Sequence, residues 1–378
     1  MHVLIVPSYY PNTYNPIDGI YFKVQAEALA EKGLKVGVVA PVIIKHYILF
    51  RQKKIDYGYK NPPHRIPTFI YQIPSFPLIK KMNEVMRLYF GKKVFKKYVE
   101  KYGLPDLVHL HSFENGVLTQ WIKNKYKINY IVTEHSTRFW RNEYSKRLLR
   151  IAKKTFKNAT KVTAVSHALK EKIAELSDAK IEVLPNFIDT SFFCPSNKSK
   201  NYDFISVGGL RDVKNYSLLI KAFNEINGRK DYKLAIIGEG PLREDLEILV
   251  TRLGQSENID FLGQLAQEEV RDLYNSSKIF VSSSKYETFG VAIIEAMSCG
   301  LPAVCTKSGG PESFITKRGL GTLCDHSILA LSSAMQNQIN SISQFENKII
   351  REHIINHYSN QAVTKILKVL YVITSKEV

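Results

Sequence analysis

Short apolar runs rich in Val and Ile recur along the first half of the chain, with more polar stretches between them. The runs are residues 2–8 (HVLIVPS), 34–41 (LKVGVVAP), 107–112 (LVHLHS), 128–136 (INYIVTEHS) and 161–166 (KVTAVS). The stretches between them show helical spacing, as in IYFKVQAEALAEKG, where Gly33 is a suitable residue to end a helix. Alternating strands and helices predict a parallel sheet with helices on both faces.

The alternation stops at residues 184–203, which are rich in Pro, Asn, Ser and Lys and form the best candidate for a linker. It resumes with apolar runs at 203–209, 232–240, 259–263, 278–284 and 301–306. We therefore predict an α/β protein with two Rossmann-like parallel-sheet domains that face each other across a cleft. Ligands of such sheets bind beyond the carboxyl ends of the strands, so the cleft is the natural site.

The expected domain boundaries follow from this pattern. The first domain takes residues 1–185, the linker 186–202 and the second domain 203–355. Residues 356–378 are expected to form a last helix, and its return to the first domain is left open.

Composition limits the class of protein. The chain has 378 residues with 44% hydrophobic content, which is typical of a globular protein of about two domains. No apolar run approaches the roughly 18 residues of a membrane span, and the first residues lack the basic region of a signal peptide. The four cysteines have neither CxxC nor zinc-ligand spacing, so we expect a reduced, cytoplasmic setting.

The net charge of +18 is concentrated in one half of the chain. Residues 1–190 hold 32 Lys and Arg against 15 Asp and Glu, whereas the remainder holds 21 against 20. A one-sided basic field favours an anionic partner, which could be a lipid surface, a phosphorylated acceptor or a nucleic acid. The alternative is a basic but unremarkable soluble protein. Against nucleic acid, the chain has no helix-turn-helix, RNP-like or zinc-finger signature.

Part of this charge lies on a predicted amphipathic helix, residues 92–102. One side carries five lysines and the other carries Val, Phe and Tyr. The lysines are Lys92, Lys93, Lys96, Lys97 and Lys101. We expect the apolar side to pack on the first domain, and the lysines to meet either water alone or anionic lipid.

Four motifs follow predicted strands of the second half, in the order SVGGLRDVKNYSLLIKAF, IIGEGP, VSSSKYETFGVAIIEAMSCG and KSGGPESF. Together they resemble the C-terminal domain of family-four retaining glycosyltransferases of the GT-B fold, the group 1 glycosyltransferases. The first half is similar to the same family through DGIYFKVQAEALAEKG, PDLVHLHS and VTEHS, and PNFIDTSFF resembles its linker signature. The resemblance spans nearly the whole chain, and it depends on the order and spacing of the motifs.

The resemblance implies a metal-independent transferase that moves a sugar, with retention, from a nucleotide sugar to an acceptor hydroxyl. The first domain would then be the acceptor side and the second would bind the nucleotide sugar. The implied acceptor is a lipid-linked or cell-surface glycan precursor, such as capsule or lipopolysaccharide. The protein is expected in the cytoplasm, with the inner face of the membrane as a further option. No cofactor or metal is expected, and no Asp-x-Asp occurs in the chain.

The segment KYETFGVAIIEAMSCG predicts a loop that turns at Gly290 into a helix. The amides of Phe289, Gly290 and Val291 at the helix start could cradle a diphosphate. In the resemblance Glu287 contacts the transferred sugar and Glu295 holds the ribose. The alternative is two acids on a solvated helix start.

Positive charge beside the phosphates would stabilise a nucleotide diphosphate leaving group, and SVGGLRDVKN supplies it. Lys214 matches the lysine of the family. Gly209 stands where members commonly carry Arg, and Arg211 could take over that role. Solvated loop charges are the alternative for both.

Glycines mark two further loops. Gly309 and Gly310 in KSGGPESF are implied to let the backbone approach the donor sugar, and Gly238 in IIGEGP is implied to end a strand beside the nucleotide. Plain turns look the same in sequence.

In the first half, Gly19 matches the second glycine of a family Gly-Gly pair whose amide lies near the donor phosphate, while Asp18 reads as an N-cap. His135 in VTEHS is implied to contact the donor sugar near the reacting centre, and the role of the adjacent Glu134 is open. His109 and His111 are expected to divide between the core and the strand end. Their spacing could suggest a metal site, but no carboxylate or cysteine cluster completes it.

Nucleotide-sugar epimerases and phosphorylases share the two-domain architecture and are the nearest rivals. An epimerase would form its product without an acceptor. A basic nucleic-acid-binding protein is the alternative from another class, and strong salt-dependent binding to arbitrary oligonucleotides would support it.

Overall fold

The computed structural model describes residues 1–12, 15, 18–44, 58–60, 66–76, 79–228, 231–317 and 319–376. The chain forms two compact units. Unit 1 comprises Met1–Val165, Leu169–Leu184 and Thr364–Val378, and unit 2 comprises Ser166–Ala168 and Pro185–Val363. In the described residues no helix is long and apolar enough to cross a membrane.

Unit 1 is built on an eight-stranded sheet with the order β3-β4-β2-β1-β5-β6-β7-β8. Every neighbouring pair is parallel except β3 and β4. The strands are β1 (His2–Pro7), β2 (Lys35–Ile44), β3 (Gly58–Lys60), β4 (Thr68–Pro74), β5 (Leu107–His111), β6 (Tyr130–Glu134), β7 (Lys161–Ala164) and β8 (Ile181–Val183). β1, β5 and β6 are buried along their whole length, as expected for strands covered on both faces.

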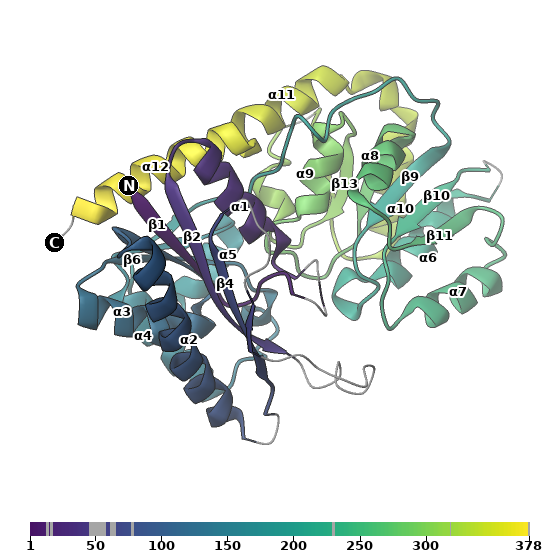
Figure 1. Cartoon of the computed structure of the whole chain (residues 1–378). Helices are drawn as coiled ribbons and strands as arrows, with labels where there is room; N and C mark the ends of the chain where they lie inside the picture. Colours follow the sequence, from purple (N-terminus) through teal and green to yellow (C-terminus); the bar gives the residue numbers. More distant parts are fainter. Residues whose placement is uncertain are drawn as a thin grey trace. The chain divides into compact units, whose positions relative to one another are not determined.

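Helices cover both faces of this sheet, as Figure 1 shows. They are α1 (Ile20–Glu31), α2 (Lys80–Tyr102), α3 (Gly116–Tyr126), α4 (Lys146–Asn158), α5 (His167–Ala174) and α12 (Asn360–Lys376). Tyr98 of α2 bonds His2 of β1, whereas Tyr371 of α12 bonds His109 of β5. His109 pairs with Ile5, an odd number of residues from His2, so the two tyrosines lie on opposite faces.

Glycines allow α2 to pack closely on the sheet and α3 to pack closely on α4. A Cβ at Gly37 of β2 would lie 2.1 Å from the Tyr98 hydroxyl, and a Cβ at Gly116 of α3 would lie 2.0 Å from Thr155 Oγ1 of α4. Helix α4 begins where the Ser145 hydroxyl accepts a bond of 3.3 Å from the Leu148 amide. Close approach of these helices therefore depends on glycine at these positions.

Unit 2 contains a six-stranded, all-parallel sheet with the order β11-β10-β9-β12-β13-β14. The strands are β9 (Tyr202–Val207), β10 (Leu234–Ile237), β11 (Ile259–Gly263), β12 (Ser277–Ser282), β13 (Ala303–Thr306) and β14 (Gly321–Cys324). The helices are α6 (Tyr216–Ile226), α7 (Arg243–Arg252), α8 (Gln267–Asn275), α9 (Val291–Ser298), α10 (Ile328–Asn340) and α11 (Asn347–Tyr358).

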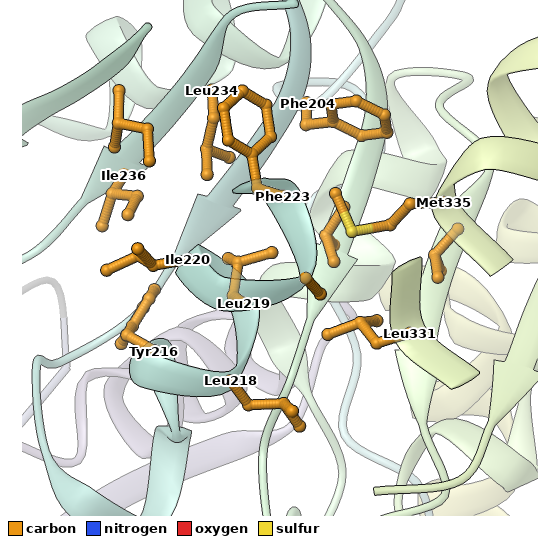
Figure 2. Packing of buried hydrophobic residues seen from close by; sticks show 14 of the residues in the cluster. Phe204, Tyr216, Leu218, Leu219, Ile220, Phe223, Leu234, Ile236, Leu331 and Met335 are labelled. Atoms are coloured by element: carbon orange, nitrogen blue, oxygen red, sulfur yellow. The ribbon is translucent and has the colours of Figure 1, made fainter. Parts of the chain in front are cut away.

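The core on one face of this sheet lies beneath α6 and α10. Figure 2 shows Leu219 and Phe223 of α6 packed with Phe204 of β9, and Leu331 and Met335 of α10 extending the same cluster. All five side chains are fully buried. The predicted fold class, two Rossmann-like parallel-sheet domains, is confirmed.

The segment expected to be a linker, 186–202, is grouped with unit 2. Its backbone is fastened there: the Ser298 hydroxyl donates to the Phe193 carbonyl at 2.6 Å, and Arg351 donates to the Thr190 and Phe193 carbonyls at 2.9 and 3.0 Å. Residues 356–378 are not one helix. Helix α11 ends at Tyr358, α12 begins at Asn360, and the chain from Thr364 onward is grouped with unit 1.

Candidate functional site

In unit 2 the loop from β12 to α9 has the form that its sequence predicts. Gly290 has a φ of 97°, in the left-handed region that favours glycine, and α9 begins at Val291 without a side-chain cap. Among the described residues, the amides of Phe289, Gly290 and Val291 donate to no acceptor. Phe289 is buried against Phe314 with ring centroids 5.9 Å apart, which anchors the loop. The uncapped helix start leaves donors available for an anion.

A second loop, which carries Gly309 and Gly310, is hydrogen-bonded to the first through backbone groups. The Glu287 amide donates to Ser308 at 2.9 Å, and the Gly310 amide donates to the Glu287 carbonyl at 2.7 Å. A Cβ at Gly310 would lie 2.4 Å from the Phe289 carbonyl oxygen, so only glycine permits this approach. Gly309 has a φ of 108°. The structure thus brings Glu287, Phe289, Gly309 and Gly310 together.

Lys214 joins this group through an ion pair with the Glu287 carboxylate. Their side chains are 29% and 12% exposed. The backbone that carries Lys214 is itself fixed, because the Ser283 hydroxyl lies 3.0 Å from the Lys214 carbonyl and the Lys285 amide donates to Val213 at 2.8 Å. A preorganised cation therefore lies at the same loops as the free amides.

Arg211 lies immediately before the turn Asp212–Lys214 and is exposed. Its Nε would be 3.7 Å from a Cβ placed at Gly209, so the Arg211 side chain passes beside the position where the family commonly has Arg. No ion pair of Arg211 occurs among the described residues.

Glu295 lies on α9, half-buried, and accepts a long bond of 3.4 Å from the Tyr274 hydroxyl. Burial raises the pKa of Glu295 to about 8, which favours the protonated form of its carboxyl group. Such a group can both donate and accept hydrogen bonds.

Gly238 follows β10 and has a φ of 137°. A Cβ there would lie 2.1 Å from the Gly208 carbonyl oxygen, which brings the loops after β9 and β10 into contact. The adjacent Glu239 lies in the loop before α7 and forms an ion pair with Arg243, the first residue of that helix.

In unit 1, Gly19 has a φ of 67° and is the N-cap of α1. The expectation that Asp18 is the N-cap is wrong, because α1 begins at Ile20 and its N-cap is Gly19, whose left-handed backbone favours glycine. A Cβ at Gly19 would lie 2.8 Å from the Tyr9 carbonyl oxygen and 2.9 Å from the Phe22 ring.

His135 follows β6 and is buried among aromatic rings. Its Nε2 lies 3.0 Å from His111 Nδ1, and its ring centroid lies 4.9 Å from Phe22 and 5.4 Å from Tyr21. Burial lowers the pKa of His135 to about 3, so the ring is neutral at neutral pH.

His109 and His111 both lie fully buried, with ring centroids 4.0 Å apart on the same side of β5. His109 bonds Tyr371 and Thr133, each at 2.7 Å, and is a core histidine, whereas His111 meets His135 at the strand end. The two histidines therefore divide by their partners, one in the core and one at the strand end, although both are buried. Within the described residues, no group of three His, Cys, Asp or Glu side chains is arranged to hold a metal ion.

Glu134 is a residue whose role the sequence left open. Its buried carboxylate accepts bonds from the amides of Phe113 at 3.1 Å, His135 at 2.9 Å and Ser136 at 3.1 Å. Burial, and to a lesser extent nearby Glu114, raises the pKa of Glu134 to about 8. Glu134 thus ties the loop after β5 to the loop after β6. Phe113 is 21 residues away, so no local pattern could have predicted this role.

Known families match both halves of the chain. The family described as Glycosyl transferases group 1 matches residues 188–355, and the family described as Glycosyltransferase Family 4 matches residues 19–192. A putative teichuronic acid biosynthesis glycosyltransferase of Bacillus subtilis is 26% identical over 355 residues, covering 89% of this chain and 88% of that protein. N-acetyl-alpha-D-glucosaminyl L-malate synthase of Bacillus anthracis is 27% identical over 58% of this chain and 61% of its own.

Solved structures share the fold. Sucrose-phosphate synthase of Thermosynechococcus elongatus matches with a TM-score of 0.79 at 20% identity, over 99% of both chains. The HepE protein of Anabaena in complex with UDP matches with a TM-score of 0.74 at 17% identity, over 98% of this chain and 100% of its own.

Two Rossmann-like sheets whose strand ends carry glycine loops, free amides and a fixed lysine define a glycosyltransferase of the GT-B fold. The chain belongs to the group 1 glycosyltransferases, and the family predicted from its motifs is confirmed.

Proposed function

We propose that the protein is a retaining, metal-independent transferase that moves a sugar from a nucleotide sugar to the hydroxyl of a lipid-linked or cell-surface glycan precursor, in the cytoplasm. The observation that carries this proposal is the Lys214–Glu287 ion pair beside the uncapped start of α9. The names of relatives support it. One is a putative glycosyltransferase of teichuronic acid biosynthesis, and HepE has been solved with UDP and with UDP-glucose.

The donor diphosphate is assigned to Lys214, Arg211 and the amides of Phe289, Gly290 and Val291. A nucleoside diphosphate gains negative charge as it leaves, and a fixed ammonium with oriented amides favours that charge more in the transition state than in the ground state. In this proposal these groups take the place of a divalent cation.

The sugar and the nucleoside are assigned to the remaining groups of unit 2. Glu287 accepts hydrogen bonds from hydroxyl groups of the transferred sugar, and Glu295 binds the ribose. Gly309 and Gly310 leave room for the sugar beside the backbone. Gly238 lies beside the nucleotide.

Unit 1 contributes Gly19, whose amide is assigned to the donor phosphate, and His135, whose Nδ1 is assigned to a hydroxyl of the transferred sugar. Retention follows if the acceptor attacks on the face that the leaving group vacates. The C1–O bond to the diphosphate breaks, the C1–O bond to the acceptor forms, and the acceptor proton passes to the leaving phosphate oxygen. No enzyme nucleophile is required, so Glu287 binds the sugar.

A panel of UDP-, GDP- and ADP-sugars, each compared with its free nucleoside, tests the proposal through thermal stabilisation. A donor at one hundred times its Kd should stabilise the protein by about 2.7 kcal/mol. Stabilisation by none of them would contradict a nucleotide-sugar site. Product formed from the donor alone, without an acceptor, would instead support an epimerase, and a requirement for inorganic phosphate would support a phosphorylase.

We also propose that unit 1 contacts an anionic lipid surface through the layer of α2, α3 and α4. Eleven exposed basic residues occur on these helices: Lys81, Lys93, Lys96, Lys97, Lys101, Lys125, Lys146, Arg150, Lys153, Lys154 and Lys157. Glu100 is the exposed acid among their described side chains. Such an imbalance attracts acidic headgroups.

Apolar side chains beside these lysines support the same contact. Ile79, which precedes α2, and Met82, Val85 and Tyr89 on its first turns are 37% to 56% exposed. At intervals of three and four residues they share one side of the helix, which is the arrangement of an interfacial helix. Lys92, predicted among the exposed lysines, is half-buried, with its Nζ 5.1 Å from the Trp121 ring centroid.

A further inference from the structure

His111 and His135 form a hydrogen-bonded pair. The ring of His111 is shielded from solvent, whereas His135 directly follows strand β6. His111 is 0% exposed and His135 is 7% exposed. The His111 ring lies 4.5 Å from that of Phe22 and 4.0 Å from that of His109, measured between centroids. These neighbours fix the plane of His111, and the 3.0 Å bond from its Nδ1 to His135 Nε2 transmits that orientation.

The bond also links the protonation of the two rings. Burial lowers the pKa of both, so each is neutral at neutral pH and carries one N–H. If His111 Nδ1 donates, the single proton of His135 must lie on Nδ1. If His135 Nε2 donates, His135 Nδ1 is a bare acceptor. One tautomer therefore dictates the other.

The two outer nitrogens, His111 Nε2 and His135 Nδ1, are buried and without a hydrogen-bond partner among the described residues. His109 provides the contrast, because both of its ring nitrogens are bonded within the protein. A buried nitrogen without a partner costs free energy in the unliganded protein, and a ligand hydroxyl can recover it.

We propose that His111 is a positioning residue, which holds the ring plane and tautomer of His135 so that Nδ1 of His135 meets one hydroxyl of the transferred sugar. The inference rests on the proposed function, in which His135 contacts that sugar. His111 itself need not touch the substrate. It acts through His135, so its removal should matter only while His135 is present.

Two amide variants separate the positioning role of His111 from its contribution to packing. The amide of His111→Asn lies near the place of Nδ1 and can still bond His135, whereas the amide of His111→Gln lies near the place of Nε2 and cannot. The probe is UDP-glucose, or whichever sugar of the panel stabilises the protein most, with water as the acceptor, and the readout is hydrolytic release of its nucleoside diphosphate. We expect His111→Gln to lower kcat at least tenfold with KM within threefold, and His111→Asn to stay within threefold of the unsubstituted protein.

A double-mutant cycle completes the test, with His109→Gln as the matched control for loss of a buried histidine. In a His135→Ala background, His111→Gln should lower kcat no further, whereas the effect of His109→Gln should be the same in both backgrounds. Additive effects of His111→Gln and His135→Ala, or a His111→Gln protein as active as His111→Asn, would overturn the inference and leave the proposed function standing. An unsubstituted chain that is stabilised by no nucleotide sugar of the panel would overturn the proposed function, and the inference with it.

Discussion

Lys214 is held on both sides: Glu287 pairs with its ammonium, and Ser283 bonds its carbonyl at 3.0 Å. Because a fixed cation needs no reorganisation as charge develops on the leaving diphosphate, Lys214→Ala should slow sugar transfer by about a hundredfold or more. Lys285→Ala is the control, since the Lys285 side chain is 41% exposed and pairs with Asp212. Initial rates at saturating donor measure both. Equal rates for the two variants would contradict the phosphate assignment.

Glu295 should affect binding of the donor more than its reaction. Ribose contacts are the same in the ground and transition states, so Glu295→Ala should raise the donor KM by about tenfold and change kcat by less than threefold. The exposed Glu268 of α8 is a matched control, and Glu268→Ala should change neither constant. A loss confined to kcat would refute the ribose assignment.

The loops of the candidate site could be predicted from the sequence because glycine and chain reversal leave local signals. Gly290, Gly309 and Gly310 lie where backbone conformation or close approach excludes a side chain. The pairing of Lys214 with Glu287 could not be predicted from the sequence, because 73 residues separate them. The contact depends on two loops that meet beyond neighbouring strands. The bond between His111 and His135 could not be predicted for the same reason, since 24 residues separate them.

At the scale of the element, the strongly apolar strands were predicted and the short or less regular ones were not. β1, β5, β6 and β12 are buried along all or nearly all of their length and have a clear signal. β3 and β8 have three residues each, too few to establish a period. β14 has one buried residue among its four, and β4 follows residues whose pattern is weak.

Helix α2 was predicted from its lysine-rich second half, residues 92–102, but it begins at Lys80. Val94, Phe95 and Tyr98 are buried, as the amphipathic pattern indicated. The first half was missed because its apolar residues are distributed over both the buried and the exposed sides. Exposed Val85 and Tyr89 have no explanation in the packing of unit 1, which is why they enter the proposed lipid contact.

The α2 contact can be tested with charge-matched variants. Each lysine near an anionic surface contributes about 1 kcal/mol, so replacing Lys93, Lys96, Lys97 and Lys101 by Gln should weaken binding to phosphatidylserine vesicles by several hundredfold. Vesicle sedimentation at low salt measures it, and raised salt should release the unsubstituted protein. The control replaces four lysines of unit 2 by Gln: Lys198, Lys221, Lys307 and Lys348. If both variants bind alike, α2 is not the contact.

At the scale of the whole molecule, the buried histidines and the buried glutamates change the stability of the fold in opposite directions as pH changes. Burial lowers the pKa of His109 and His135 to about 3, below the unfolded value near 6.5, so stability is lost as pH falls from 6.5 toward 3. Burial raises the pKa of Glu134 and Glu295 to about 8, above the unfolded value of 4.5, so stability is lost as pH rises from 4.5 to 8.

We therefore expect maximal resistance to urea between about pH 5 and 6.5. Unfolding midpoints from pH 4 to 8 measure it. Glu295→Gln should lessen the fall in stability between pH 5 and 8 by about 1–2 kcal/mol, a value reduced for the partial exposure of Glu295. His109→Gln should lessen the fall below pH 6.5. A profile that rises steadily to pH 8 would contradict these shifts.

Unit 1 takes residues from both ends of the chain, and Tyr371 of α12 reaches His109 across 262 residues of sequence. A ribosome that adds about 5–20 residues per second needs roughly 13–50 s to make that span. Throughout that time the nascent sheet of unit 1 lacks its last helix, and the apolar surface that α12 will cover is open to chaperones and to neighbouring chains. Unit 2 emerges whole within the same interval. The order of synthesis therefore makes the first unit to be translated the last one to be completed.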